Sequence, residues 1–238
     1  MTQLTQEQFL RDVATHQIHV LRDDGVYRHI RFKKPGTTCM HFDLVTWPGY
    51  LAYSGDMGCF VFSRIEDMFE FFRTDRRDKK SNDEICINLG YWSEKLEAVS
   101  GGRRGSEGAK EFSPEVFTKL IHEWRISWIR EYRDTLSKEQ RRELWEQVSE
   151  EVLSKADDGG IRAFDAAYGF SFPVKGQRHP IQFDDLFEHN CDEYTHRFIW
   201  CCYALAWGIK LYDEHQSLKA NISKRSEISQ HLSMCGAL

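Results

Sequence analysis

The pattern of apolar positions divides the chain into a first third with period two and a remainder with the helical period. Residues 5–14 predict a short amphipathic helix with Phe9 on its apolar side. Residues 19–34 then alternate polar and apolar side chains on either side of Asp24-Gly25, a typical hairpin turn. Residues 41–47, 50–56 and 59–64 follow as extended stretches with Gly- and Pro-containing turns between them. The pattern predicts an antiparallel meander of five short strands.

Helical signals begin after these strands. Ser63 with Glu66 three residues later forms a capping-box pattern, and we expect a helix from Ser63 that packs on the sheet. Residues 87–99 predict a short extended piece followed by a helix. Beyond the glycine-rich segment 101–108, helices are predicted to start after Ser113-Pro114 and at Ser137, and a short one over residues 161–170.

The longest apolar run lies in a predicted helix from Asn190 to Asp213. Asn190 is the expected N-cap, with Glu193 in the capping-box position. No charged residue occurs from Phe198 to Ile209, so this part must be surrounded by protein or lipid, and it is shorter than the roughly 20 residues that cross a bilayer. Two arrangements stay open: a central core helix, or a subunit interface in which the face formed by Trp200, Tyr203 and Trp207 packs across a two-fold axis in a homodimer.

We therefore expect the α+β class: an N-terminal antiparallel β-meander covered by helices on one face, followed by an α-helical region with a central buried helix. Residues 1–100 are the expected sheet region and residues 109–238 the expected helical region packing on it. Whether these are one domain or two depends on whether residues 101–108 are an internal loop or a linker.

Composition narrows the functional classes. The net charge of −5 disfavours a general nucleic-acid coat, although local basic patches are compatible with it. The seven cysteines, an odd number, indicate a reducing compartment. The N-terminal residues lack a basic-then-apolar signal segment, so we expect a cytoplasmic protein with no membrane association.

Two groups of residues contain metal-ligand or acid–base types. His189, Cys191, Glu193 and His196 do not match the paired spacings of zinc sites, and helix capping with a Glu193–Arg197 pair is the favoured interpretation. His41 and Asp43 point to the same face of one predicted strand, and Asp56 lies in a nearby turn; together they suggest acid–base or metal chemistry.

Phosphate-binding and nucleophile motifs are absent from the sequence. The turn at residues 54–58 joins two strands and lacks the Gly-Lys-Ser/Thr ending of a phosphate loop, and there is no Gly-x-Ser-x-Gly elbow. We therefore predict no catalytic set, no cofactor and no metal, and the sequence favours a protein that is not an enzyme.

A basic and aromatic segment is the main candidate for recognition. Its basic residues are interrupted by acids, which favours a solvated loop over a nucleic-acid site. A long charged loop is also typical of protein recognition. The predicted binding residues in and beside it are Arg73, Arg76, Arg77, Lys79, Lys80, Tyr91 and Trp92.

Three stretches, at residues 47–73, 87–98 and 193–213, resemble an uncharacterised family of proteins from bacteriophages and prophages. The likeness spans about residues 17–213. The resemblance implies a small accessory protein acting in the host bacterial cytoplasm. Phage proteins of this size often counter host defence, for instance as anti-CRISPR proteins, which is an association by class.

Three functions follow as hypotheses. The leading one is a counter-defence factor that inhibits a host defence protein by surface contact, through the loop at residues 73–84, Tyr91-Trp92 and the turn at Asp56. The second is a pocket that sequesters a nucleotide signal, formed by Asn190, Glu193, His196 and Arg197 with stacking from Tyr53 or Trp92. The third is a metal-dependent hydrolase or nuclease that uses His41, Asp43 and Asp56.

Overall fold

A computed structural model describes residues 4–73, 84–100 and 108–235, with side chains described as far as Lys224. The chain forms two compact units. The sheet unit comprises Thr2–Ala109 and Tyr194–Leu238, and the helical unit comprises Lys110–Glu193. The division into domains at residues 1–100 and 109–238 remains a prediction. In the structure, the last helix belongs to the same compact unit as the sheet.

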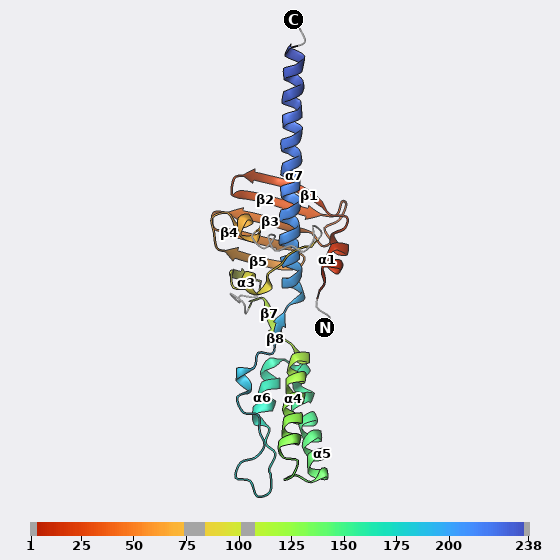
Figure 1. The fold of residues 1–238 in the computed structure, drawn as a ribbon, viewed down its shortest axis with the longest axis vertical. Coiled ribbons are helices and arrows are strands. Elements are labelled where there is room, and N and C mark those ends of the chain that lie inside the picture. Colours follow the sequence, from red (N-terminus) through yellow and green to blue (C-terminus); the bar gives the residue numbers. More distant parts are fainter. Residues whose placement is uncertain (1–3, 74–83, 101–107, 236–238) are drawn as a thin grey trace. The chain divides into compact units, whose positions relative to one another are not determined.

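The sheet unit contains a six-stranded antiparallel sheet with strands in sequence order, which confirms the predicted α+β class (Figure 1). The predicted five-strand meander corresponds to the first five strands, because each turn joins strands that become neighbours. The strands are β1 (Gln17–Asp24), β2 (Tyr27–Lys33), β3 (Phe42–Trp47), β4 (Tyr50–Gly55), β5 (Gly58–Ser63) and β6 (Leu96–Val99).

The sixth strand corrects the order predicted for residues 87–99. Helix α3 (Leu89–Ser93) comes first, because the Asn88 side chain accepts a hydrogen bond from the Tyr91 N–H and caps it. The chain then extends as β6, where Leu96 lies opposite Phe62 of β5 and is buried. The extended piece therefore follows the helix.

Helix α7 (His196–Cys235) is the central helix of the sheet unit. Its predicted start at Asn190 is wrong. The Asn190 side chain accepts a hydrogen bond from the Asp192 N–H, and Asp192–Tyr194 form a short strand, β8, that pairs with β7 (Lys110–Phe112). The helix instead begins after Thr195, whose hydroxyl oxygen accepts a hydrogen bond from the Phe198 N–H.

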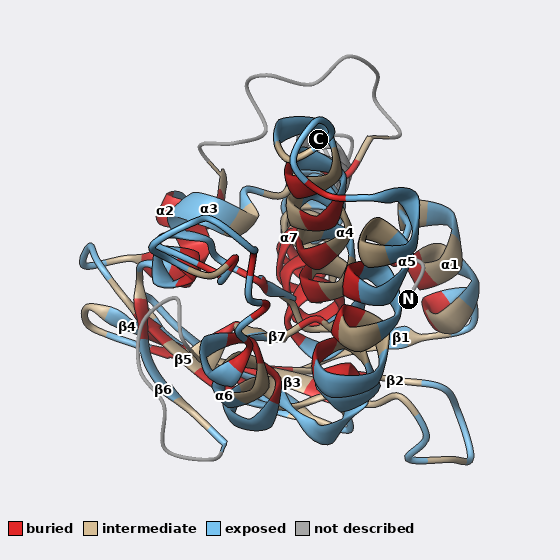
Figure 2. Ribbon diagram, turned by 90° about the horizontal axis from the view of Figure 1, so that it is seen from below, coloured by how far each residue is buried: buried red, intermediate tan, exposed pale blue. Residues whose placement is uncertain are grey.

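The apolar part of α7 is a core helix. The sequence allowed the face formed by Trp200, Tyr203 and Trp207 to be a dimer interface, but in the structure Phe9 of α1 (Gln6–Val13) packs against it. The Phe9 ring centroid lies 5.1 Å from that of Trp200, 5.6 Å from that of Tyr203 and 6.1 Å from that of Trp207. Figure 2 shows the buried side of α7 against the sheet. Burial is complete enough that the pKa of the Cys201 thiol is raised well above its ordinary value.

Helix α2 (Met68–Arg73) begins later than predicted. Ser63 is the last residue of β5, and Asp67 caps the helix in its place, because its carboxylate accepts a hydrogen bond from the Phe69 N–H. Of the four residues expected on its apolar face, Met68, Phe69 and Phe72 are buried, whereas Ile65 precedes the helix and is exposed.

The helical unit has its own core, built on α4 (Pro114–Glu131), α5 (Lys138–Gln147) and α6 (Gly160–Gly169). Ser113 caps α4 and a Ser137–Gln140 capping box starts α5, as predicted. Helix α5 continues into a π-helical turn (Val148–Val152) and a 3₁₀ turn (Leu153–Asp158), and Leu186–Glu188 forms another 3₁₀ turn. In the part of the chain that is described, no helix is both long and apolar enough to cross a membrane.

Candidate interaction surface

The helices of the sheet unit pack on one face of the sheet, and the other face is exposed or half-buried (Figure 2). We call this second face the open face. Successive strand residues alternate between the two faces, and residues paired across antiparallel strands share a face. The strand register therefore defines the open face as three rows of side chains.

The first row is polar and runs His19, Arg31, Asp43, Ser54 and Cys59. Within it, the Asp43 carboxylate accepts hydrogen bonds from Arg31 Nε at 2.8 Å and Arg31 Nη2 at 2.7 Å. His29, from the neighbouring row, has its Nε2 2.9 Å from Asp43 Oδ2. These contacts make a fixed ionic cluster in the open face.

The electrostatics of Asp43 follow from these contacts. Burial acts to raise the pKa of Asp43, but the hydrogen bonds from Arg31 and His29 outweigh it, so the pKa lies below its ordinary value. The hydrogen bond to Asp43 likewise raises the pKa of Arg31. Asp43 is thus an ionised acceptor with its partners in place, and it is poorly suited to act as a general base.

The second row is mainly aliphatic. His29 is followed across the sheet by Val45, Ala52, Val61 and Ala98. Val45, Ala52 and Val61 are half-buried and Ala98 is exposed. These short side chains lie in register across four strands, so another protein surface can pack closely on this aliphatic strip.

The third row contains an aromatic pair at the turn between β3 and β4. Trp47 and Tyr50 lie opposite each other, with ring centroids 5.4 Å apart and planes at 14°. Their exposed fractions are 36% and 38%, so both rings face solvent over a large area. The turn is held in place because the Gly49 N–H donates to the Glu66 carbonyl at 3.0 Å.

A β-bulge shapes the edge of the open face. The register between β1 and β2 shifts between Val20 and Arg22, which leaves Leu21 exposed. After the bulge, Arg22 lies opposite His29 on the open face, whereas Asp23 points to the helix-covered face and accepts a hydrogen bond from the Tyr212 hydroxyl at 2.7 Å. The bulge therefore adds a basic residue to the open face.

The structure brings His41 and Asp56 together but not Asp43. His41 Nδ1 lies 3.0 Å from Asp56 Oδ1, and the Met40 N–H donates to Asp56 Oδ2 at 2.6 Å. A Cβ atom at Gly55 would lie 2.3 Å from the His41 carbonyl oxygen, so the turn requires glycine there. Asp56 thus holds the loop before β3. Among the described residues, no three His, Cys, Asp or Glu side chains converge to hold a metal ion.

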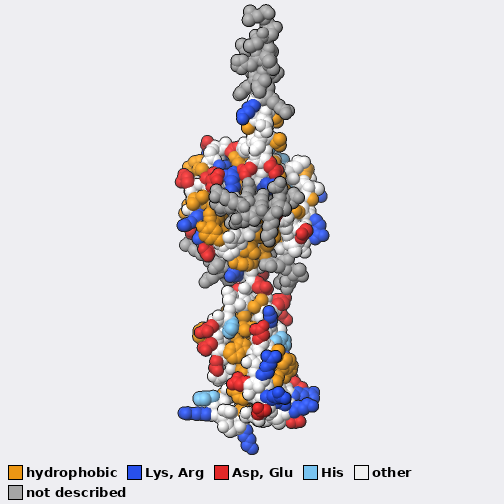
Figure 3. Space-filling model, viewed as in Figure 1, with side chains coloured by type: hydrophobic (Ala, Val, Ile, Leu, Met, Phe, Trp, Pro, Cys, Tyr) orange, Lys and Arg blue, Asp and Glu red, His pale blue; other side chains and the backbone are white. Residues whose placement is uncertain are grey.

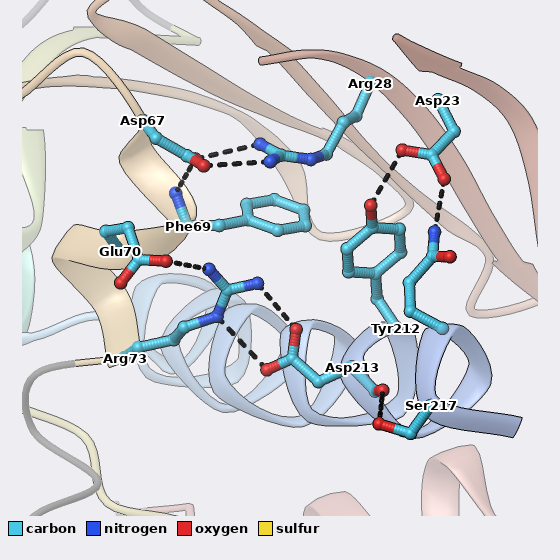
Figure 4. Close-up of polar contacts among 10 residues, drawn as sticks. Asp23, Arg28, Asp67, Phe69, Glu70, Arg73, Tyr212, Asp213 and Ser217 are labelled. Atoms are coloured by element: carbon cyan, nitrogen blue, oxygen red, sulfur yellow. Dashed lines mark hydrogen bonds and ion pairs between the residues drawn. The ribbon is translucent and has the colours of Figure 1, made fainter. Parts of the chain in front are cut away.

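The predicted recognition residues separate into different roles. Arg73 binds Asp213 of α7 through Nε at 3.1 Å and Nη2 at 2.6 Å, and Glu70 through Nη1, so it joins α2 to α7 (Figure 4). Tyr91 is 39% exposed with Lys95 Nζ 4.7 Å from its ring centre. Trp92 is fully buried against Phe72, so it belongs to the core. The predictions for Arg76, Arg77, Lys79 and Lys80 lie outside the described residues.

The residues of the predicted nucleotide pocket are exposed: Asn190, Glu193, His196 and Arg197. Asn190 and Glu193 belong to the helical unit, and His196 and Arg197 to the sheet unit. The two proposed stacking residues, Tyr53 and Trp92, have no exposed surface. A base cannot stack on either ring, so this part of the expectation is wrong.

The helical unit has a groove of about 690 Å³ along α4, lined in part by Lys119, His122 and Glu123. His122 Nδ1 accepts a hydrogen bond from Arg125 Nη2 at 2.7 Å. Arg125 is buried, its guanidinium lies 3.6 Å from the Trp145 ring centre, and its Nη1 donates to Ser149 Oγ at 2.6 Å. This network joins α4 to α5 and to the π-helical turn, and it leaves Arg125 Nε buried without a hydrogen-bond partner.

Sequence reasoning missed the open face, although a signal for it exists. The outward positions of the predicted strands include Val45, Trp47, Tyr50 and Val61, which are unusually apolar for a solvated face.

The side of the sheet unit seen in Figure 3 carries mixed charge, with acidic and basic side chains interspersed.

Comparison of the chain with known protein families, curated proteins and solved structures gave no match.

Proposed function

We propose that this protein is a non-enzymatic binding protein whose open face covers the surface of another protein. The observation that carries the proposal is the stacked Trp47–Tyr50 pair beside the aliphatic strip Val45, Ala52 and Val61. Exposed aromatic side chains such as Trp and Tyr are typical anchors at the centre of protein interfaces. The Arg31–Asp43 cluster in the adjacent row supplies directional polar contacts on one side of this strip.

The partner in this proposal is a host defence protein, which the phage-encoded protein inhibits by occupying its surface in the bacterial cytoplasm. This step is supported by the resemblance of residues 47–73, 87–98 and 193–213 to phage and prophage proteins. The first of these stretches contains Trp47, Tyr50 and Val61, so the resembling segment and the open face overlap.

A protein partner fits the open face better than a nucleic acid. Arg31 is neutralised locally by Asp43, and the whole chain carries a net charge of −5. Nucleic-acid surfaces need basic groups that are free to contact phosphates. Trp47 and Tyr50 also stack on each other, which leaves fewer ring faces for bases.

The test has two stages. First, the protein is expressed in bacteria that carry individual defence systems, and phage plating identifies a system that it blocks. Second, the purified protein is titrated against the purified components of that system by calorimetry. Trp47→Ala with Tyr50→Ala should weaken binding at least about 30-fold, the loss expected for an interface anchor worth roughly 2 kcal/mol.

The matched control is Phe187→Ala, which removes an aromatic side chain that is 70% exposed in the helical unit. It should bind like the wild type. Circular dichroism establishes that each variant is folded. Equal affinity of the wild type and the Trp47/Tyr50 double variant would contradict the role of the open face, and failure to block any defence system would contradict the counter-defence role.

A further inference from the structure

Strand β1 is an edge strand of the six-stranded sheet. It pairs with β2 on one side, and no hydrogen bond from another part of the described chain reaches its main chain on the other side. An edge strand presents a row of N–H and C=O groups that lack partners. At eight residues, Gln17–Asp24, β1 offers this row over a length that another extended segment can match. We call this side of β1 the outer edge.

Helix α7 crosses the sheet and continues past the outer edge (Figure 1). Near its start, Phe198 packs on Phe60 of β5, with ring centroids 5.9 Å apart. Further along, the Tyr212 hydroxyl donates a hydrogen bond to Asp23 of β1 at 2.7 Å. The helix therefore runs across the strands towards β1 and leaves the sheet just beyond Tyr212. We call residues 213–224 of the helix the overhang, and all of them from 217 onward are exposed.

Two large apolar side chains of the overhang lie on the side of α7 that packs against the sheet. Gly208 marks that side, because a Cβ atom there would lie 3.1 Å from the Phe32 ring of β2. Residues seven apart on an α-helix differ by only about 20° in direction. Ile222 is fourteen residues after Gly208, and Leu218 is seven residues after Leu211, which packs against the core of the sheet unit. Ile222 and Leu218 are nevertheless 68% and 63% exposed, because the described sheet ends at β1.

The overhang is long enough to cover a further strand. A helix rises about 1.5 Å per residue, so Leu218 and Ile222 lie roughly 9 Å and 15 Å beyond Tyr212 along the axis. Neighbouring strands are about 4.8 Å apart. Helical side chains also lean towards the N-terminus of the helix, which brings both residues back towards β1. A strand added at the outer edge would therefore lie beneath the overhang.

Polar contacts hold the overhang above this place (Figure 4). Arg73 of α2 binds Asp213 with two hydrogen bonds. Asp23 of β1 accepts a hydrogen bond from Gln216 Nε2. Because these contacts come from both α2 and β1, the direction of the helix is fixed where it passes the outer edge.

We propose that an extended segment of another protein adds to the outer edge of β1 as a further strand, beneath the overhang. Its backbone pairs with the free N–H and C=O groups of β1, and its helix-facing side chains cover Leu218 and Ile222. Because side chains alternate along a strand, the segment needs apolar residues at every second position, on its helix-facing side. This site is separate from the open face and does not depend on the partner proposed for that face.

Features of β1 favour a different protein over a second copy of this chain. The register with β2 is regular over residues 17–20, and these residues include no Asp, Glu, Lys or Arg. After the bulge come Arg22, Asp23 and Asp24. A bulge and charged side chains act against the pairing of two identical edges. A segment of another protein can pair with the regular half of β1 and supply complementary charge to the other half.

The probe for this site is a peptide selected from a displayed library of random linear peptides. The library is first depleted on Leu218→Glu with Ile222→Glu, whose substitutions fall at exposed positions and should leave the fold intact. It is then enriched on the wild-type chain. The recovered peptide should bind the wild type at least about tenfold more tightly than the double variant, as measured by fluorescence anisotropy. Hydrogen exchange should show that the bound peptide protects amides of β1.

Two control variants locate the site. Ala220→Glu lies on the opposite side of the helix from Leu218 and Ile222, at about 100° per residue, and should bind the peptide like the wild type. Trp47→Ala with Tyr50→Ala changes the open face and should also bind the peptide like the wild type. The outcome for the outer edge is therefore distinct from the outcome for the proposed function.

Pairing through the backbone is tested on the peptide itself. The N–H groups of successive strand residues point to opposite edges, so N-methylation of alternate residues blocks one edge only. Methylation of one alternate set should weaken binding at least about tenfold, and methylation of the other set should not. Equal effects of the two sets, no protection of β1, or a selection that recovers no peptide would overturn the proposal.

Discussion

Arg28 of β2 and Asp67, the residue before α2, form a two-point ion pair in which both N–O distances are 2.8 Å. The guanidinium group also lies 4.7 Å from the ring centre of Phe69 and 5.7 Å from that of Tyr212 (Figure 4). Sheet, α2 and α7 therefore meet at one buried arginine. Its charge is balanced by a carboxylate that also caps α2.

Asp67→Asn should lower the free energy of unfolding by about 2–3 kcal/mol. The substitution removes the negative charge of the pair and leaves the buried Arg28 charged without a carboxylate partner. An uncompensated buried charge is costly, so the folded state is destabilised. Urea denaturation followed by circular dichroism measures the change.

The control for this prediction is Asp24→Asn, which breaks the exposed Arg22–Asp24 pair at 3.3 Å. It should change stability by less than about 0.5 kcal/mol, because exposed ion pairs contribute little. Similar effects of the two substitutions would show that the Arg28–Asp67 pair is not important for the fold.

The five-strand meander was predictable because strands β2 to β5 alternate between buried and more exposed residues, and the turns β1–β2, β3–β4 and β4–β5 are each two residues long. For example, a two-residue turn at Pro48-Gly49 places Val45 opposite Ala52, so the two side chains lie on the same face of the sheet. The helix starts were not predictable in the same way. The Ser63–Glu66 and Asn190–Glu193 patterns are good local caps, but Ser63 is used by β5 and Asn190 by the turn before β8. Tertiary pairing overrode the local signal.

Only part of the candidate surface could be predicted from the sequence. The alternation of side chains along a strand shows that Asp43, Val45 and Trp47 lie on the same face of the sheet. It does not show which of the two faces is covered by helices. Nor does it show which acid pairs with which base: Asp43 binds Arg31 of the neighbouring strand, and His41 binds Asp56 in the turn between β4 and β5. Those pairings depend on the register between strands, which emerges only with the assembled sheet.

Acid should destabilise the protein partly through Asp43. The pKa of Asp43 is lowered in the folded state, whereas an aspartate in the unfolded chain titrates near about 3.9. Between these values the unfolded chain binds more protons, so this stabilisation is complete above about pH 4 and is lost as the pH falls through the folded value.

Asp43→Asn should therefore flatten the decline in stability below about pH 4, as measured by urea midpoints at a series of acidic pH values. Asp24→Asn serves again as the control and should keep the wild-type slope. An unchanged slope in Asp43→Asn would mean that its pairing with Arg31 and His29 is not maintained in solution.

His122 should give a second dependence on pH in a higher range. Burial, and then the neighbouring Arg125, lower the pKa of His122. Unfolded histidine titrates near about 6.5, so below that value the unfolded chain binds more protons and stability falls with decreasing pH.

His122→Gln keeps an acceptor for Arg125 but cannot be protonated, and it should reduce the loss of stability between pH 7 and pH 5. Thermal denaturation at half-unit pH steps measures this, and His179→Gln, at an exposed position, is the control. A wild-type profile for His122→Gln would argue against the contact between His122 and Arg125.

Gly208 allows α7 to pack closely on the sheet. A Cβ atom there would lie 3.1 Å from Leu44 Cδ1 and 3.1 Å from the Phe32 ring, both buried and confined by neighbours. Gly208→Val should therefore destabilise the protein by about 1–3 kcal/mol, the usual cost of overpacking a core. Ala220→Val, which adds a comparable side chain at an exposed position of the same helix, should cost less than about 1 kcal/mol, the effect of lower helix propensity alone. Urea unfolding of both variants separates the two contributions, and equal losses would mean that the helix does not pack this tightly on β2 and β3.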